Sequence, residues 1–284
     1  MIFRVGPCED GKRLDSFLRS RGVSRRLINS LKHTENGMTR RGETVRTVDR
    51  VFAGDEIDLY EPSQVRSSED TGVPVLYEDE HCIVFSKPPF MPCHRSPKHY
   101  DDTLEIEFHK LFPELPMRCI NRLDKNTSGC VIAAKTLAGA SWLQRSVSKV
   151  YVGITKRSGL AGGRICAPIA REEGSTVKRC VRADGKFAAT TFKTVENINN
   201  LTLTAFTLET GRTHQIRVHC AHRGLPLLGD DLYGGDTSLI KRQALHCAKV
   251  SFVIPFTDEP ISVFSPMPED MVRVLGKDVN VKSL

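Results

Sequence analysis

The feature that most constrains the fold is a polar, glycine-ended segment that runs directly into an uninterrupted apolar stretch. Residues 121–129 read Asn-Arg-Leu-Asp-Lys-Asn-Thr-Ser-Gly, and residues 130–134 are all apolar. A short apolar run after a turn-like segment is typical of a buried strand. We therefore expect Asp124 at the mouth of a buried strand. Taken alone, Arg122 and Asp124 are more simply explained as a local ion pair or a cap.

A second stretch, residues 209–219, concentrates charged and polar side chains around an apolar alternation that predicts a strand. It contains Arg212, His214, Gln215, Arg217 and His219. Polar residues at this density are costly to bury without partners, so we expect them to line a cleft for an anionic ligand. For the two histidines and the glutamine, the simpler explanation is buried hydrogen bonding that supports the strand carrying Arg217.

Together the two stretches resemble the signature of the RluA-type family of pseudouridine synthases, which pairs R-L-D-x-x-T-S-G with a later G-R-T-H-Q-I-R-V-H. Both occur here in the same order, and the resemblance extends from residue 73 to about residue 271. It implies a mixed α/β (α+β) catalytic domain with an antiparallel-rich mixed sheet and a cleft across one face. Two positions depart from the family pattern: Asn121 replaces the usual histidine, and Phe90 replaces a usual glycine.

The reaction of such a family breaks the bond from ribose to the base nitrogen, turns the uracil and rejoins it through carbon five. One carboxylate is enough, as a nucleophile or as a base that removes a sugar proton, and the sequence leaves both routes open. The resemblance implies that Asp124 is this carboxylate, that Arg217 is its cationic partner, and that Tyr151 stacks on uracil. We expect a bidentate contact of the planar guanidinium with the carboxylate. The target base must be flipped out of the RNA, and the resemblance places Arg122 in the gap.

Residues 1–61 are predicted to form a small unit of two short helices and a hairpin. Apolar residues at helical spacing follow residue 13, and Ser24 is a suitable N-cap for a second helix. Arg25, Arg26 and other basic residues on the outside indicate a surface for the RNA backbone, although a merely solvated basic face is the alternative. The segment resembles the RNA-binding module first known from ribosomal small-subunit protein S-four. Residues 62–72 are predicted to be a flexible linker, and residues 73–284 the catalytic domain.

Charge and cysteine usage narrow the class of protein. Lys and Arg number 41 against 34 Asp and Glu, and this excess of basic residues fits a polyanionic partner. The nine cysteines are scattered without a C-x-x-C pair, which favours reduced thiols in the cytoplasm over disulfides or a structural zinc site. We expect no membrane contact, because no signal peptide or spanning stretch is evident. We also expect no metal and no cofactor, because the reaction needs no Lewis acid and no acidic ligands accompany the histidines. The expected protein is a cytoplasmic monomer.

The sequence thus predicts an RNA uridine isomerase, with large-subunit ribosomal RNA as the favoured substrate and transfer RNA as the alternative. Arg122, Arg212, Arg25 and Arg26 are the candidate RNA contacts. A non-catalytic RNA-binding or ribosome-assembly factor on the same fold is the main rival, but Asp124, Tyr151 and Arg217 occurring together argue against it. A carboxylate-dependent hydrolase would need a second acid or metal ligands.

Overall fold

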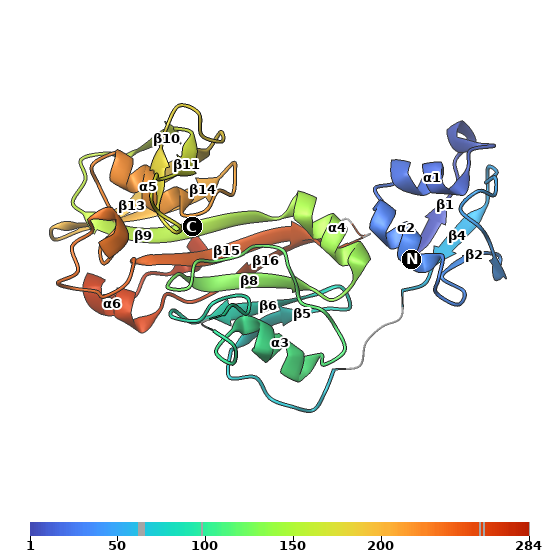
Figure 1. Ribbon diagram of the computed structural model, residues 1–284, viewed down its shortest axis with the longest axis horizontal. Helices are drawn as coiled ribbons and strands as arrows, with labels where there is room; N and C mark the ends of the chain where they lie inside the picture. Colours follow the sequence, from blue (N-terminus) through green and yellow to red (C-terminus); the bar gives the residue numbers. More distant parts are fainter. Residues whose placement is uncertain (62–65, 98, 256, 258, 284) are drawn as a thin grey trace.

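The computed structural model describes residues 1–61, 66–97, 99–255, 257 and 259–283. Its larger body is built on a mixed sheet of ten strands among these residues, and a small N-terminal module lies beside one end of the sheet (Figure 1). The strands run in the order β10-β13-β14-β9-β15-β8-β6-β5, with β16 beside β15 and β7 beside β8. Their bounds are β5 (Val75–Glu78), β6 (Cys82–Lys87), β7 (Arg118–Cys119), β8 (Ser128–Ala134), β9 (Ser148–Lys156), β10 (Gly162–Cys166), β13 (Ala189–Ile198), β14 (Leu201–Leu208), β15 (Leu245–Val253) and β16 (Pro260–Phe264).

Neighbouring strands are antiparallel except at one seam, where β8 runs parallel to β15. Only two pairs of residues join these strands, Ser128 with His246 and Gly129 with Cys247. Gly129 has φ +114°, and a Cβ atom there would lie 2.2 Å from the Cys247 carbonyl oxygen. Glycine is therefore needed for the two backbones to approach this closely. The predicted antiparallel-rich mixed sheet and the buried strand after residue 127 are confirmed.

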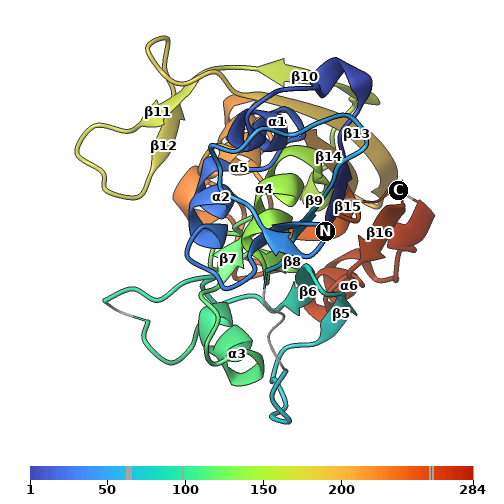
Figure 2. The ribbon, with the colours of Figure 1, turned by 90° about the vertical axis from the view of Figure 1, so that its right-hand side faces the viewer.

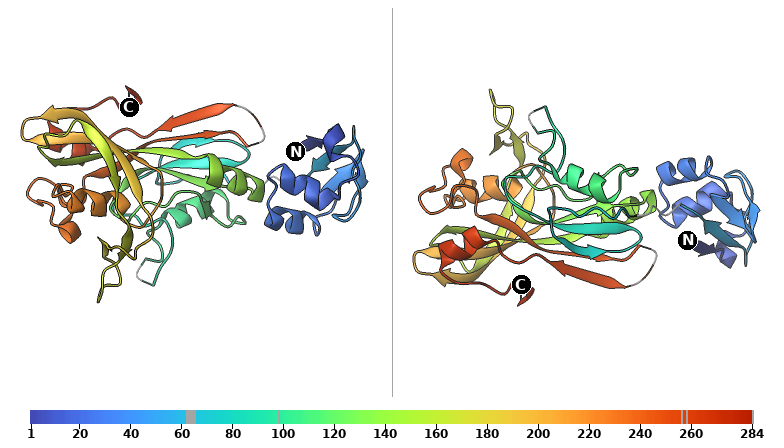
Figure 3. Two further views of the ribbon diagram at one scale, coloured as in Figure 1. Left: turned by 90° about the horizontal axis from the view of Figure 1, so that it is seen from above. Right: turned by 90° about the horizontal axis from the view of Figure 1, so that it is seen from below.

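Helices cover both faces of the sheet. α3 (Leu104–Leu111) and α5 (Gln215–His222) lie on one face, and α6 (Glu269–Leu275) lies on the other (Figure 3). α4 (Leu137–Ser146) lies at the end of the sheet nearest the module (Figure 1). The hairpin of β11 (Ile169–Arg171) and β12 (Arg179–Val181) projects from the body (Figure 2). Short 3-10 helices lie later in the chain, at Asp231–Tyr233 and Val281–Ser283.

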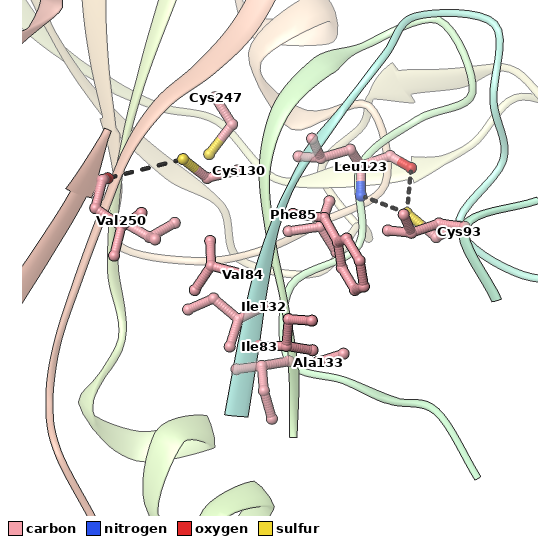
Figure 4. Close-up of a cluster of buried hydrophobic side chains, with 14 of the residues drawn as sticks. Ile83, Val84, Phe85, Cys93, Leu123, Cys130, Ile132, Ala133, Cys247 and Val250 are labelled. Carbon is pink, nitrogen blue, oxygen red and sulfur yellow. Dashed lines mark hydrogen bonds between the residues drawn. The ribbon is translucent and has the colours of Figure 1, made fainter. Parts of the chain in front are cut away.

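Hydrophobic side chains fill the space on both sides of the sheet. One large cluster includes Val84 of β6 and Ile132 of β8, which lie opposite each other on these neighbouring strands (Figure 4). Because side chains alternate along a strand, Tyr151 of β9 joins this cluster while Val152 joins the cluster under α6. Tyr151 therefore faces the α5 side. In the described part of the chain, no helix combines the length and apolar character that crossing a bilayer requires.

Thr136 caps α4, because its side chain accepts a hydrogen bond from the Gly139 amide in the first turn of the helix. The prediction of a strand over the second polar stretch is wrong, since Gln215–His222 is the helix α5. Every residue from 215 to 220 is buried, so the polar-apolar alternation does not report a one-sided strand. His214 precedes the helix with φ +57°, a left-handed conformation that turns the chain into α5.

The N-terminal module contains α1 (Leu14–Ser20) and α2 (Arg25–Leu31), packed on a sheet of order β1-β4-β2-β3. Its remaining elements are β1 (Ile2–Arg4), a 3-10 helix (Pro7–Glu9), β2 (Met38–Arg40), β3 (Glu43–Thr44) and β4 (Glu56–Leu59). The prediction of two helices and a hairpin is thus correct in its helices but too small in its sheet. Ser24 caps α2 by accepting a hydrogen bond from the Leu27 amide.

Part of the predicted flexible linker is fastened to the larger body. The Ser67 amide donates to the Leu111 carbonyl at 2.8 Å, and the Gly72 amide donates to the Glu107 carboxylate at 2.8 Å. Arg66 also pairs with Glu78 at 2.8 Å. Residues 66–72 are therefore held against α3 and β5, contrary to the prediction, because their backbone groups find partners on those elements. Residues 62–65 lie outside the described residues.

Candidate active site

A pocket of about 440 Å³ opens where the seam between β8 and β15 meets the N-terminal end of α5. Its volume lies within the range of about 300–1,000 Å³ usual for small-ligand sites. It is lined by Arg122, Asp124, Tyr151, Arg212, His214 and Arg217, among others. The structure therefore brings together all three predicted catalytic residues and two of the predicted RNA-binding arginines. The other two, Arg25 and Arg26, lie on α2 in the module.

The turn that carries Asp124 is held by side chains on both sides. The Asn121 amide group donates to the Cys130 carbonyl at 2.9 Å and accepts from the Ile132 amide at 2.9 Å. Lys87, fully buried, donates to the Lys125 carbonyl at 3.1 Å, and burial lowers the pKa of its ammonium to about 8. The Cys93 sulfur contacts the backbone of Leu123 (Figure 4). Asn121 thus fixes the turn to β8 through hydrogen bonds that need no titratable ring.

The Arg217 guanidinium joins two carboxylates. Its Nη1 donates to Asp124 Oδ2 at 3.1 Å, while Nε and Nη2 donate to the two oxygens of Asp230 at 2.8 Å each. The predicted pairing of Arg217 with Asp124 is present, but the bidentate partner is Asp230. Burial would lower the pKa of Arg217, yet hydrogen bonds and charge from Asp230, and then from Asp124, raise it above its usual range. The guanidinium therefore stays charged.

The two carboxylates differ in exposure, and this difference separates their roles. The side chain of Asp124 is 26% exposed, whereas that of Asp230 is fully buried beneath the guanidinium. Only Asp124 can reach a molecule in the pocket. Asp230 lies behind Arg217 and supplies a fixed counter-charge that orients the guanidinium.

A histidine and a tyrosine complete this side of the pocket. His214 places Nε2 3.8 Å from Asp124 Oδ2 and Nδ1 2.9 Å from the Tyr233 hydroxyl. That hydroxyl accepts the Arg179 amide hydrogen at 3.0 Å, so its own proton is available to Nδ1. Burial lowers the pKa of His214, although the charge of Asp124 opposes the shift. A neutral ring that accepts at Nδ1 carries its hydrogen on Nε2, toward Asp124.

Tyr151 forms the opposite wall and is only 6% exposed. Burial raises the pKa of its hydroxyl well above the usual value. The hydroxyl therefore remains protonated at neutral pH, and the ring offers an apolar face to a planar ligand. Lys149, two residues earlier on β9, also lines the pocket, and burial lowers the pKa of its ammonium.

Gln215 and His219 support the site from behind. The Gln215 amide donates to the Ala189 carbonyl at 3.0 Å, and the His219 ring donates from Nε2 to the Ala167 carbonyl at 3.0 Å. The Thr190 hydroxyl lies 2.8 Å from the other ring nitrogen of His219. The simpler explanation of buried hydrogen bonding is therefore confirmed for both residues, although what they support is a helix.

Two residues of the site were not predicted from the sequence, Asp230 and Tyr233. Both come from the short polar segment Gly-Asp-Asp-Leu-Tyr-Gly at residues 229–234. The available signal was an acidic residue and an aromatic residue between glycines, soon after the second polar stretch. Only the folded chain shows that the segment meets Arg217, whose guanidinium also lies 5.1 Å from the Tyr233 ring centre.

The fold and the site together describe a mixed sheet with a pocket in which a partly exposed carboxylate lies beside a buried guanidinium. Comparison with known proteins identifies the family. The family profile described as RNA pseudouridylate synthase matches residues 81–222. This chain belongs to the RNA pseudouridine synthase family, and it is an enzyme that isomerises uridine in RNA to pseudouridine.

Individual relatives agree with this assignment. Ribosomal large subunit pseudouridine synthase D of Xanthomonas campestris pv. campestris is 35% identical over 261 residues, which are 83% of this chain and 79% of the relative. The Bacillus subtilis protein named uncharacterized RNA pseudouridine synthase YjbO is 33% identical over 268 residues, 89% of this chain and 95% of the relative. The solved structure of human RNA pseudouridylate synthase domain containing 1 has the same fold, with a TM-score of 0.59 and 23% identity over 78% of this chain and 100% of that one.

Proposed function

We propose that this pseudouridine synthase is of the RluA type, acts on large-subunit ribosomal RNA and uses Asp124 as its catalytic carboxylate. The observation that carries the proposal is a carboxylate that faces the pocket and is held by a buried guanidinium. The choice of RNA is supported by relatives named ribosomal large subunit pseudouridine synthase D, from Xanthomonas campestris and Pseudomonas aeruginosa. Transfer RNA is the alternative substrate.

The proposed reaction begins with the target uridine flipped into the pocket, because its reacting atoms are unreachable within stacked RNA. Tyr151 stacks on the uracil. Arg122, which is exposed and lines the pocket, fills the space that the base has left. Arg212, also exposed there, contacts a neighbouring phosphate.

Asp124 then acts on the nucleotide while Arg217 stabilises its negative charge. The carboxylate adds covalently or removes a sugar proton, and either route ends in the same exchange of bonds. The bond from the sugar carbon to N1 of uracil breaks, and a bond from that carbon to C5 forms. The proton on C5 leaves to solvent and N1 gains one, so the product is an isomer and no redox partner is needed.

The division of labour along the chain is part of the proposal. Residues 1–61 act as an RNA-binding module of the kind found in ribosomal small-subunit protein S-four, followed by a linker over 62–72 and the catalytic domain over 73–284. In support, most of the module's apolar residues pack in a cluster of their own, and Arg25 and Arg26 are exposed on α2. We propose that the protein works as a monomer in the cytoplasm.

Asp124→Asn tests the proposed role of the carboxylate. Asparagine has nearly the same size and keeps a hydrogen bond to Arg217, but it cannot serve as nucleophile or base, so isomerisation should be abolished while RNA affinity is kept. The assay is tritium release from large-subunit ribosomal RNA transcripts labelled at carbon five of uridine, beside filter binding of the same RNA. Release by the variant at a rate near wild type would remove Asp124 from the mechanism. If wild type bound the RNA well but released no tritium from ribosomal or transfer RNA, the assembly-factor alternative would replace the proposal.

A further inference from the structure

The N-terminal module is fixed to the catalytic domain through α4. Leu137 and Ala138 of α4 belong to the module's own hydrophobic cluster. The Glu61 carboxylate accepts hydrogen bonds from both of their amides, at 2.6 and 3.3 Å. At the other end of α4, Arg145 Nη2 donates to the Gly22 carbonyl at 3.0 Å. The module is therefore held at both ends of one helix, as its position against α4 in Figures 1 and 2 shows.

A groove of about 690 Å³ lies between the two parts. The module contributes Ser24 and Arg26 to it, and the catalytic domain contributes Met117, Arg118, Ser141 and Arg145. Ile120 and Gln144 line both this groove and the catalytic pocket. The groove and the pocket therefore adjoin each other, and they lie between Asp124 and α2 of the module.

The side chains that line the groove carry an excess of positive charge. No hydrogen bond or ion pair to the Arg26 guanidinium occurs within the described part of the chain, and no carboxylate is among the described residues that line the groove. Arg118 donates from Nη1 to the Lys135 carbonyl at 3.1 Å, but its buried Nε has no partner among those residues. Burial lowers the pKa of Arg118, the charge of Glu61 opposes this, and the charge of Arg26 lowers it further.

Like charges brought together from two domains are a cost to folding unless a ligand neutralises them. A phosphate diester is an anion that accepts hydrogen bonds from guanidinium groups. The groove adjoins the pocket that takes the target uridine. The anion that would lie closest to the groove is therefore the phosphate backbone of the same RNA strand.

We propose that the groove carries the phosphate backbone of the RNA strand next to the target uridine, with Arg26 and Arg118 as its phosphate contacts. This inference rests on the proposed function and extends it. Because the module is docked on α4, the pocket and the module grip one continuous segment of RNA at a fixed separation. The enzyme therefore selects uridines that lie at a set distance along the strand from the feature that the module binds.

Arg26→Gln and Arg118→Gln in the full-length protein test the groove, with Arg46→Gln as the matched control. Arg46 belongs to the same module, its side chain is 82% exposed, and its ion pair with Asp49 spans three residues of one loop. All three changes remove one positive charge. The probes are an unmodified large-subunit ribosomal RNA transcript and a short uridine oligonucleotide that reaches only the pocket. Filter binding is measured over a range of salt concentrations, and tritium release is measured on the transcript.

Arg26→Gln and Arg118→Gln should each weaken binding of the transcript roughly fivefold and make the slope of log affinity against log salt shallower by about 0.7–1. Binding of the short oligonucleotide should stay unchanged, because that probe reaches only the pocket. Arg46→Gln should match wild type on both probes. Because Arg118 is partly buried, Arg118→Lys serves as a second variant that keeps the charge, and it should keep the salt slope.

Equal behaviour of Arg26→Gln and Arg46→Gln on the transcript would overturn the groove proposal, and so would an equal loss on both probes. These outcomes are independent of catalysis, because they are read from binding. If wild type released no tritium while the two groove variants still flattened its salt slope, the proposed function would fail and the groove would stand. Normal tritium release with unchanged slopes would overturn the groove and leave the proposed function intact.

Discussion

Arg217 is the residue whose positive charge lies between the two carboxylates of the site, those of Asp124 and Asp230. It uses three of its nitrogens, two toward the buried Asp230 and one toward Asp124. A lysine could not reproduce this geometry, because its ammonium is a point charge without the planar fork. Asp230 fixes the guanidinium in place, and Asp124 receives only one hydrogen bond from it, which leaves other lone pairs of the Asp124 carboxylate open to the pocket.

Arg217→Met should lower turnover about a thousandfold, a loss at the upper end for removing one charge-stabilising donor. The measurement is tritium release at saturating RNA, beside filter binding of the same RNA.

Asp230→Asn is the control for this prediction, because it disturbs the same guanidinium from the side away from the pocket. It should cost stability, about 3 kcal/mol for a broken buried ion pair, but lower turnover only about tenfold. Equal losses of turnover in the two variants would count against a direct effect of Arg217 on Asp124.

At the scale of elements, the seam between β8 and β15 positions the turn that carries Asp124, and His246 of β15 holds Ser128 of β8 there. Its Nε2 donates to the Ser265 carbonyl at 3.1 Å, so Nδ1 accepts from the Ser128 hydroxyl at 2.9 Å. The ring is neutral in this arrangement, and protonation would force a second donor against Ser128. Burial lowers the pKa of His246 from its ordinary 6.5 to about 4, despite the Ser265 carbonyl.

This shift predicts how stability depends on pH. The unfolded chain binds a proton at His246 below about pH 6.5, whereas the folded chain resists it until about pH 4. The folded state therefore loses about 3 kcal/mol of stability from this group as pH falls through that window. The free energy of unfolding in urea, measured at several pH values, should fall more steeply for wild type than for His246→Leu. Parallel curves for the two proteins would show that His246 does not titrate in this way.

At the scale of the whole molecule, we propose that the docked module and the catalytic pocket form one RNA-binding surface. Exposed or partly exposed arginines line the groove beside α2 and the pocket: Arg26 and Arg118 in the groove, and Arg122 and Arg212 in the pocket. Each can contact one phosphate, and such contacts add to affinity without adding to the chemistry.

Deletion of residues 1–60 should therefore separate affinity from turnover. Glu61 is kept to cap α4, and Leu137→Ser replaces an apolar side chain that the deletion would expose. Affinity for the ribosomal RNA transcript should fall and its salt dependence flatten by about 0.7–1 per lost phosphate contact, while turnover persists at high concentrations of a short substrate. Full-length Leu137→Ser is the control. Loss of all turnover in a truncated protein that circular dichroism shows to be folded would contradict this separation.

Elements with local signals can be predicted from the amino-acid sequence. The apolar run 130–134 after a glycine-ended turn specifies β8, Thr136 begins α4, and the two motifs together single out Asp124 and Arg217. Phe90 is a related case: it stands where glycine is usual, and the structure places it at φ +66°, a conformation that only glycine adopts without strain.

Which groups meet in the site depends instead on the folded chain. Asp124 and Arg217 are 93 residues apart, and Asp230 joins them from a third segment whose place beside Arg217 only the folded chain shows. Residues 215–220 form a helix that is buried on every side. Such a helix lacks the one-sided apolar periodicity by which a helix is predicted from sequence. The docking of the module likewise depends on contacts between Gly22 and Arg145, far apart in the chain. Local patterns encode elements, whereas ion pairs and domain contacts depend on three-dimensional neighbours that no local pattern reports.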